Sequence, residues 1–265
     1  MASTEYQAHT VNVGGAAIHY LVGGSGAPIV ALHGFDGNPG WLPAYDDLAQ
    51  RFTVYAPTHP GFAGSERPQW LESFTDLSRF YLWILQELNL AKATLIGFSI
   101  GGWLAAEIAV LSPGIVERLI LVDAMGVRPR EGEIADIFLH GSEGTRRLAI
   151  FDPAQVPNYE LLFGRKPSPE EREASAINRE AAIRYCWKPY MHDPALPFLL
   201  PRLRDLVSLI VWGKEDRIVP LESAELYRRA IAGAKLELIE RCGHLPHLER
   251  PVEFLRIVND FVSGR

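Results

Sequence analysis

The sequence lacks the features that mark several large classes of protein. Its 265 residues include only two cysteines, Cys186 and Cys242, which are too few for a disulfide framework and do not form a metal-binding spacing. No apolar run is long enough to cross a bilayer. Residues 1–10 have neither the charged region nor the apolar region of a signal peptide. We therefore expect a reduced, cytoplasmic protein without a membrane span.

Positive charge is also scarce. The 26 Lys and Arg residues are outnumbered by 32 Asp and Glu residues, so the formal net charge is −6, and the basic residues are scattered. This balance argues against nucleic acid or an anionic membrane as a partner held by bulk charge. The glycine-rich segment 23–28 lacks the lysine of a phosphate-binding loop, and no His-Glu-x-x-His pattern occurs. We expect no cofactor and no bound metal.

The segments that are present alternate between two patterns. Strand-like segments occur at residues 29–32, 52–56, 94–98, 116–122, 207–212 and 235–239, and the segment 29–32 is continuously apolar, as expected of a strand buried on both faces. Helix-like segments lie between or after them, at residues 41–50, 74–90, 103–107, 221–231 and 252–262. Two β-like runs around Gly14-Gly15 predict a hairpin at the beginning. The alternation predicts an α/β fold with a mostly parallel central sheet and right-handed crossovers.

This alternation is interrupted between residues 126 and 203. The segment is rich in proline and charge and has no strong strand pattern. Ser168-Pro169-Glu170-Glu171 predicts a helix start, with a capping box and proline at the first helical position. We expect a helical cap here, inserted into a core formed by residues 1–125 and 204–265. Its aromatic residues could roof an apolar pocket, although packing within the insertion is the preferred interpretation of any single one: Phe138, Phe151, Tyr159, Phe163, Trp187, Tyr190 and Phe198.

The most informative stretch is Gly97-Phe98-Ser99-Ile100-Gly101. It has the Gly-x-Ser-x-Gly spacing of a nucleophile elbow and stands between strand-like and helix-like sequence. At such a turn the strand and the helix pass close together, so the flanking residues must be small. The serine hydroxyl then projects beside the free N–H groups of the new helix. Ser99 is therefore the candidate nucleophile.

A serine nucleophile needs a base, and the base needs a group that orients it. Asp216 follows the strand-like run 207–212, and His244 follows the run 235–239. Functional groups in open α/β sheets gather at the carboxyl ends of the strands, and the order Ser, Asp, His along the chain is the one found with this elbow. We predict Ser99 as nucleophile, His244 as base and Asp216 as the acid that fixes the imidazole.

Together these motifs resemble the α/β-hydrolases, and more narrowly the capped serine esterases and the meta-cleavage-product hydrolases that break carbon–carbon bonds. The matching segments run in the family's order along the whole chain, at residues 32–35, 60–65, 97–102, 212–220 and 243–251. The resemblance implies that the backbone N–H groups of Phe35 and Ile100 form the oxyanion hole. Thr58 departs from the family, which often has aspartate at that position, and we interpret it as a structural residue.

Other residues could share the site. Asp123 also follows a strand-like run and is an alternative acid, while Glu215 should point elsewhere. His247 is expected to be a structural group near His244, and His33 to brace the oxyanion loop rather than transfer protons. The isolated histidines at 59, 140 and 192 are expected in surface or core roles rather than as metal ligands.

The leading functional hypothesis is a cofactor-independent carboxylesterase acting on small to medium apolar esters. Carbon–carbon bond hydrolysis is the second hypothesis, and lactone cleavage would use the same three residues. A ligand receptor that keeps the fold with only slow turnover is the alternative from another class. A homo-oligomer is compatible with the sequence, which does not define acyl chain length, natural substrate or oligomeric state.

Overall fold

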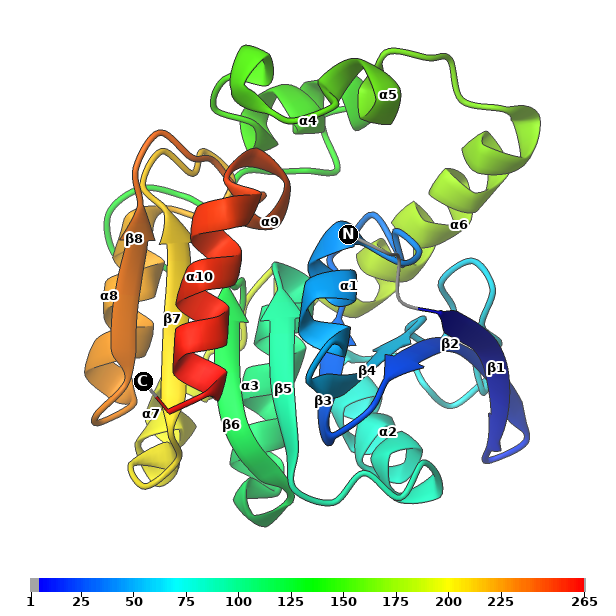
Figure 1. Cartoon of the computed structure of the whole chain (residues 1–265), viewed down its shortest axis with the longest axis vertical. Helices are drawn as coiled ribbons and strands as arrows, with labels where there is room; N and C mark the ends of the chain where they lie inside the picture. The colour runs from blue at the N-terminus through cyan, green and yellow to red at the C-terminus, as the bar shows by residue number, and fades with distance from the viewer. Residues whose placement is uncertain (1–4, 265) are drawn as a thin grey trace.

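The central feature of the fold is a single eight-stranded sheet, seen in the computed structural model, which describes residues 5–264 apart from the side chain at 161 (Figure 1). The strands are β1 (Tyr6–Val13), β2 (Ala16–Gly24), β3 (Ala27–Leu32), β4 (Phe52–Pro57), β5 (Ala93–Phe98), β6 (Val116–Val122), β7 (Ser208–Gly213) and β8 (Lys235–Ile239). Their order in the sheet is β1-β2-β4-β3-β5-β6-β7-β8. The β1–β2 hairpin and the β2–β4 pair are antiparallel, whereas β4, β3 and β5 to β8 are parallel. The α/β-hydrolase fold expected from the sequence is confirmed.

Helices cover both faces of the sheet. In Figure 1, α1 (Pro43–Ala49) and α10 (Pro251–Val262) lie in front of it, and α2 (Phe74–Glu87), α3 (Ile100–Leu111) and α8 (Leu221–Ala230) lie behind it. A short 3-10 turn, η1 (Pro113–Ile115), follows α3. Helix α3 is buried along almost its whole length, which explains why its sequence is apolar on every side.

Burial on both faces also explains the continuous apolar strands. Every residue of β5 and of β7 is buried. Successive side chains point to opposite faces, so Leu95 belongs to the core layer that contains α3, and Ile96 belongs to the layer that contains α10. Because both faces are covered, these strands read as runs rather than as alternations. This is what made them recognisable in the sequence.

The segment between β6 and β7 is helical. It contains α4 (Ser142–Ala149), η2 (Pro153–Gln155), α5 (Tyr159–Phe163), α6 (Pro169–Cys186), α7 (Leu196–Leu199) and η3 (Leu200–Leu203). In Figure 1, α4 and α5 lie beyond the carboxyl ends of the parallel strands, whereas α7 lies near their opposite ends. The capping box predicted at Ser168 is present, with its hydroxyl accepting from the Glu171 N–H. The division into a core and a cap at residues 126–203 stays a prediction.

Two expectations from the sequence concern membranes and targeting. Within residues 5–264, no helix is both long enough and apolar enough to cross a membrane. The expected lack of a signal peptide rests partly on residues 1–4, which lie outside the described residues.

Candidate active site

Ser99 occupies the sharp turn between β5 and α3. Its backbone has φ 55° and ψ −117°, a conformation that costs about 1–3 kcal/mol and persists only when the surroundings enforce it. A Cβ atom on Gly97 would overlap the carbonyl oxygen of Gly101, and one on Gly101 would overlap that of Leu32. The close approach predicted for this turn is therefore present, and only glycine fits two residues before and two residues after the serine.

The two predicted oxyanion donors lie on neighbouring elements. Ile100 is the first residue of α3, so its N–H has no acceptor within the helix. Phe35 lies in the loop after β3, and this loop passes against the nucleophile, since a Cβ on Gly34 would lie 3.4 Å from the Ser99 Cβ. Both positions fit N–H groups that face an oxyanion formed at Ser99.

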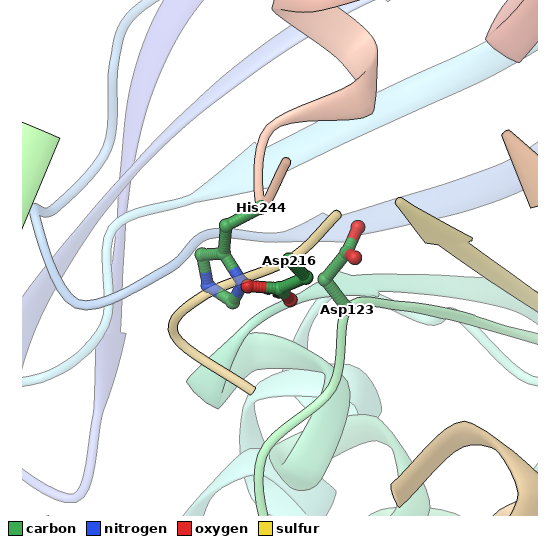
Figure 2. A group of neighbouring side chains, drawn as sticks. All are labelled: Asp123, Asp216 and His244. Carbon is green, nitrogen blue, oxygen red and sulfur yellow. Dashed lines mark hydrogen bonds and ion pairs between the residues drawn. The ribbon is translucent and has the colours of Figure 1, made fainter. Parts of the chain in front are cut away.

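The predicted base and acid meet at the carboxyl ends of β7 and β8. His244 Nδ1 lies 2.8 Å from Asp216 Oδ2, and both side chains are almost completely buried (Figure 2). Because a carboxylate accepts, Nδ1 carries the proton and Nε2 is left free to accept one. Ser99 Oγ and His244 Nε2 are both buried, and neither has a hydrogen-bond partner among the described residues.

Asp216 is itself held in place by the turn that follows β7. Its Oδ1 accepts the N–H groups of Ile218 at 2.7 Å and Val219 at 3.1 Å. The two oxygens therefore have separate tasks: Oδ1 fixes the carboxylate, and Oδ2 faces the imidazole. An asparagine at position 216 would therefore have to place its amide oxygen at the Oδ1 position and its amide nitrogen toward His244.

The rival acid, Asp123, lies on the other side of Asp216 from His244 (Figure 2). Its Oδ1 accepts the Gly213 N–H at 2.9 Å, while Oδ2 has no partner within residues 5–264. Burial, followed by the neighbouring charge of Asp216, raises the pKa of Asp123 well above its usual range. The neutral form of Asp123 is therefore favoured, and His244 bonds to Asp216 rather than to Asp123.

The same three side chains raise the question of a metal ion. One ligand atom from each of Asp123, Asp216 and His244 lies within 4.8 Å of the others. However, His244 Nδ1 and both Asp216 oxygens are already joined by hydrogen bonds, and Asp123 Oδ1 receives a backbone N–H. Among these ligand atoms, only Asp123 Oδ2 is left without a hydrogen bond to the described residues, so this set does not fit a metal site.

Two buried histidines support the loop after β3, which carries the predicted oxyanion donor Phe35. The rings of His33 and His59 stack with centroids 3.6 Å apart. His33 Nδ1 donates to the Gly34 carbonyl at 2.7 Å, and its Nε2 accepts the His59 N–H at 2.9 Å. His59 Nε2 donates to the His33 carbonyl at 3.0 Å, and its Nδ1 accepts from Tyr81. Burial lowers the pKa of His33 to about 4, so both rings are neutral braces, as expected for His33.

Glu249 is a structural residue of the site whose role could not be read from the sequence. It is buried, and its Oε1 accepts the Gly243 N–H at 2.9 Å while its Oε2 accepts the Phe151 N–H at 2.8 Å. The His244 N–H also donates to the Ala149 carbonyl at 2.6 Å. These bonds join the loop that carries His244 to the end of α4. The sequence signal was only an acid five residues after the histidine, on the short helix α9 (Pro246–Glu249).

Ser99 and His244 line the same cavity, of about 210 Å³. Most of its wall is apolar: Phe35, Pro39, Leu42, Tyr45, Phe98, Phe163, Leu245 and Leu248. Of the seven aromatic residues named above as a possible roof, only Phe163 is in this wall, and Phe138 lines an adjoining smaller cavity. Trp187 and Phe198 are 58% and 85% exposed, so they do not roof the pocket.

Two polar residues of the wall were not predicted as site residues. His247 Nδ1 is buried without a partner among the described residues, and burial lowers the pKa of this imidazole to about 3. Asp36, directly after Phe35, contributes a carboxylate. No motif of the sequence marked either residue as facing the pocket.

Comparisons with known proteins identify the family and the fold of this chain. A family model described as the alpha/beta hydrolase family matches residues 29–257. A 2-hydroxy-6-oxo-2,4-heptadienoate hydrolase of Pseudomonas putida is 29% identical, covering 91% of this chain and 91% of the relative. The solved structure of a 2-hydroxy-6-oxo-6-phenylhexa-2,4-dienoate hydrolase from Rhodococcus is 25% identical with a TM-score of 0.78, covering 98% and 99%. Naproxen esterase from Bacillus subtilis, 18% identical with a TM-score of 0.78 over 98% and 92%, shares the fold. The chain belongs to the alpha/beta hydrolase family.

Proposed function

We propose that the protein is a serine hydrolase, and specifically a carboxylesterase that cleaves small to medium esters. One observation supports this more than any other. Ser99, at a strained turn, shares a cavity with His244, whose Nδ1 is held by Asp216 so that Nε2 is free. The catalytic roles follow from this arrangement, with Ser99 as nucleophile, His244 as base and Asp216 as orienting acid.

The reaction proceeds through an acyl-enzyme. Ser99 Oγ attacks the ester carbonyl while His244 Nε2 takes its proton, and the imidazolium then gives that proton to the leaving alkoxide. Water, deprotonated by the same nitrogen, releases the acid. The N–H groups of Phe35 and Ile100 stabilise the oxyanion in both steps, and each such donor is worth about 2.7–4 kcal/mol.

Carbon–carbon bond hydrolysis is the second candidate, because the name of the Pseudomonas relative describes a hydrolase of a heptadienoate. A dienoate carries a carboxylate, and a buried carboxylate needs a cationic or hydrogen-bonding partner. The described residues that line the Ser99 cavity include no Lys or Arg, and they do include Asp36. This difference favours an ester over a dienoate as the substrate. Lactone cleavage would need the same three residues and remains a third candidate.

The test is turnover of p-nitrophenyl acetate and butyrate by wild type and Ser99→Ala. Ser25→Ala, on an exposed turn, is the matched control and should keep wild-type activity. Ester cleavage that survives in Ser99→Ala would reject Ser99 as nucleophile.

A panel that adds a lactone and a ring-fission dienoate separates the candidate reactions. We expect kcat/KM to be highest for an ester. Faster turnover of the dienoate would assign carbon–carbon hydrolysis, and faster turnover of the lactone would assign lactonase activity. Failure of a fluorophosphonate to label Ser99 in folded protein, with no turnover, would favour a ligand receptor.

A further inference from the structure

A carboxylate that the proposed chemistry does not use stands in the wall of the Ser99 cavity. Asp36 lines this cavity and also the smaller one beneath segment 137–145 and α6. Its backbone is fixed from both sides, because its carbonyl accepts from Asn178 Nδ2 at 2.6 Å and it directly follows the oxyanion residue Phe35. Movement away from the pocket would therefore disturb the oxyanion loop.

The Asp36 carboxylate has no partner in the part of the chain that the structure describes. Among residues 5–264, no hydrogen-bond donor or cationic side chain pairs with it. Arg179, the cation that lines the adjoining cavity, instead donates to the carbonyl oxygens of Phe138 and His140. The charge of Asp36 is therefore not neutralised by a neighbouring ion pair.

The surroundings of Asp36 strengthen the interaction of its carboxylate with other charged groups in the cavity. Asp36 remains accessible to solvent, yet protein encloses it closely enough that desolvation raises its pKa to about 6, with His244 acting in the opposite direction. At pH 8 the group is ionised. The cavity wall is otherwise mostly apolar, and two charges interact more strongly beside apolar walls than in open water.

We propose that Asp36 determines specificity: it rejects acyl groups that carry a carboxylate and accepts those that are uncharged or positively charged. The proposal rests on the proposed function, because it assumes ester cleavage at Ser99. A carboxylate on the acyl group would meet Asp36 without a cation between them. A hydroxyl, an amide N–H or an ammonium group would find in Asp36 an acceptor with free lone pairs.

The experiment uses three p-nitrophenyl esters of similar length at pH 8 and constant ionic strength. They are mono-p-nitrophenyl adipate, which is anionic, its methyl ester, which is neutral, and p-nitrophenyl 5-trimethylammoniopentanoate, which is cationic. kcat/KM is measured for wild type, Asp36→Asn and Asp36→Ser, after subtraction of the uncatalysed rate. Asp205→Asn removes the same charge from a side chain that is 92% exposed, and it is the matched control.

In wild type we expect the methyl ester to be cleaved at least roughly ten-fold more efficiently than the anionic ester. Asp36→Asn and Asp36→Ser should each reduce this ratio about ten-fold and lower the relative rate of the cationic ester. Asp205→Asn should keep the wild-type ratios. Ester cleavage by Ser99 with the same ratios in both Asp36 variants would overturn this proposal alone. Ester cleavage that is equal in wild type and Ser99→Ala would overturn the proposed function, and this proposal with it.

Discussion

Replacing Asp216 with asparagine should inactivate the enzyme by fixing the wrong tautomer of His244. The N–H groups of Ile218 and Val219 need an acceptor at Oδ1, so the new amide oxygen must stay there. The amide nitrogen then takes the place of Oδ2, 2.8 Å from His244 Nδ1. Turning the amide around would leave two N–H groups without an acceptor, at about 1–3 kcal/mol each. His244 Nδ1 must therefore accept, which puts the ring proton on Nε2.

A protonated Nε2 cannot take the proton of Ser99. We expect Asp216→Asn to lower kcat about 10⁴-fold, equivalent to roughly 5–6 kcal/mol of transition-state stabilisation. The assay is kcat on p-nitrophenyl butyrate, together with ¹⁵N NMR of the imidazole to identify the tautomer. The NMR should report Nδ1–H in wild type and Nε2–H in the variant.

Asp123→Asn is the matched comparison. Its amide oxygen can still accept the Gly213 N–H, and burial already favours the uncharged form of Asp123. We expect a loss of less than about ten-fold, because His244 keeps its bond to Asp216. Asp216→Asn retaining more than about a tenth of wild-type kcat, or keeping the Nδ1–H tautomer, would refute the argument. A larger loss in Asp123→Asn than in Asp216→Asn would move the acid to Asp123.

Two further predictions concern stability. Burial raises the pKa of Glu107 to about 7 in the folded protein. Between about pH 4.5 and pH 7 the folded state therefore holds a proton that the unfolded state releases, and the free energy of unfolding falls as the pH rises through this range. Glu107→Gln keeps an acceptor for the Trp103 indole N–H but does not titrate. In urea unfolding, its free energy of unfolding relative to that of wild type should be about 2 kcal/mol higher at pH 8 than at pH 5. The same difference from wild type at both pH values would contradict this argument. Gly101→Ala should cost more than about 2 kcal/mol because its Cβ would overlap the Leu32 carbonyl, while Gly114→Ala, with open space around it, should be nearly neutral. Equal melting temperatures for the two alanine variants would contradict the packing argument.

Much of the architecture could be predicted from the sequence because local patterns and the fold agree. Apolar runs predicted β3 and β5 to β7, since strands covered on both faces need apolar residues at most positions, whereas β8, at the edge of the sheet, is mostly exposed. The glycines beside Ser99 indicated the elbow, because a close backbone approach excludes any Cβ. The positions of Asp216 and His244 after their strands predicted that they would meet, as they do.

The sequence did not reveal which residues line the pocket. The segment between β6 and β7 buries its aromatic residues irregularly, so Phe163 faces the Ser99 cavity while Phe198, also aromatic, is exposed. Its helices pack through contacts between segments far apart in the chain, such as the bond from Asn178 to the Asp36 carbonyl. Local periodicity carries no information about such pairs.

The sequence by itself therefore determined the fold and the residues proposed to perform the chemistry, because both depend on short-range patterns. Only the tertiary structure decided the protonation and pairing of those groups. Asp123 and Asp216 are equivalent in sequence, as each is an acid that follows a strand. They differ because Asp216 receives two backbone N–H groups and the imidazole, whereas Asp123 is buried beside it with one oxygen unpaired among the described residues. Burial and charge at a distance are properties of the folded chain alone.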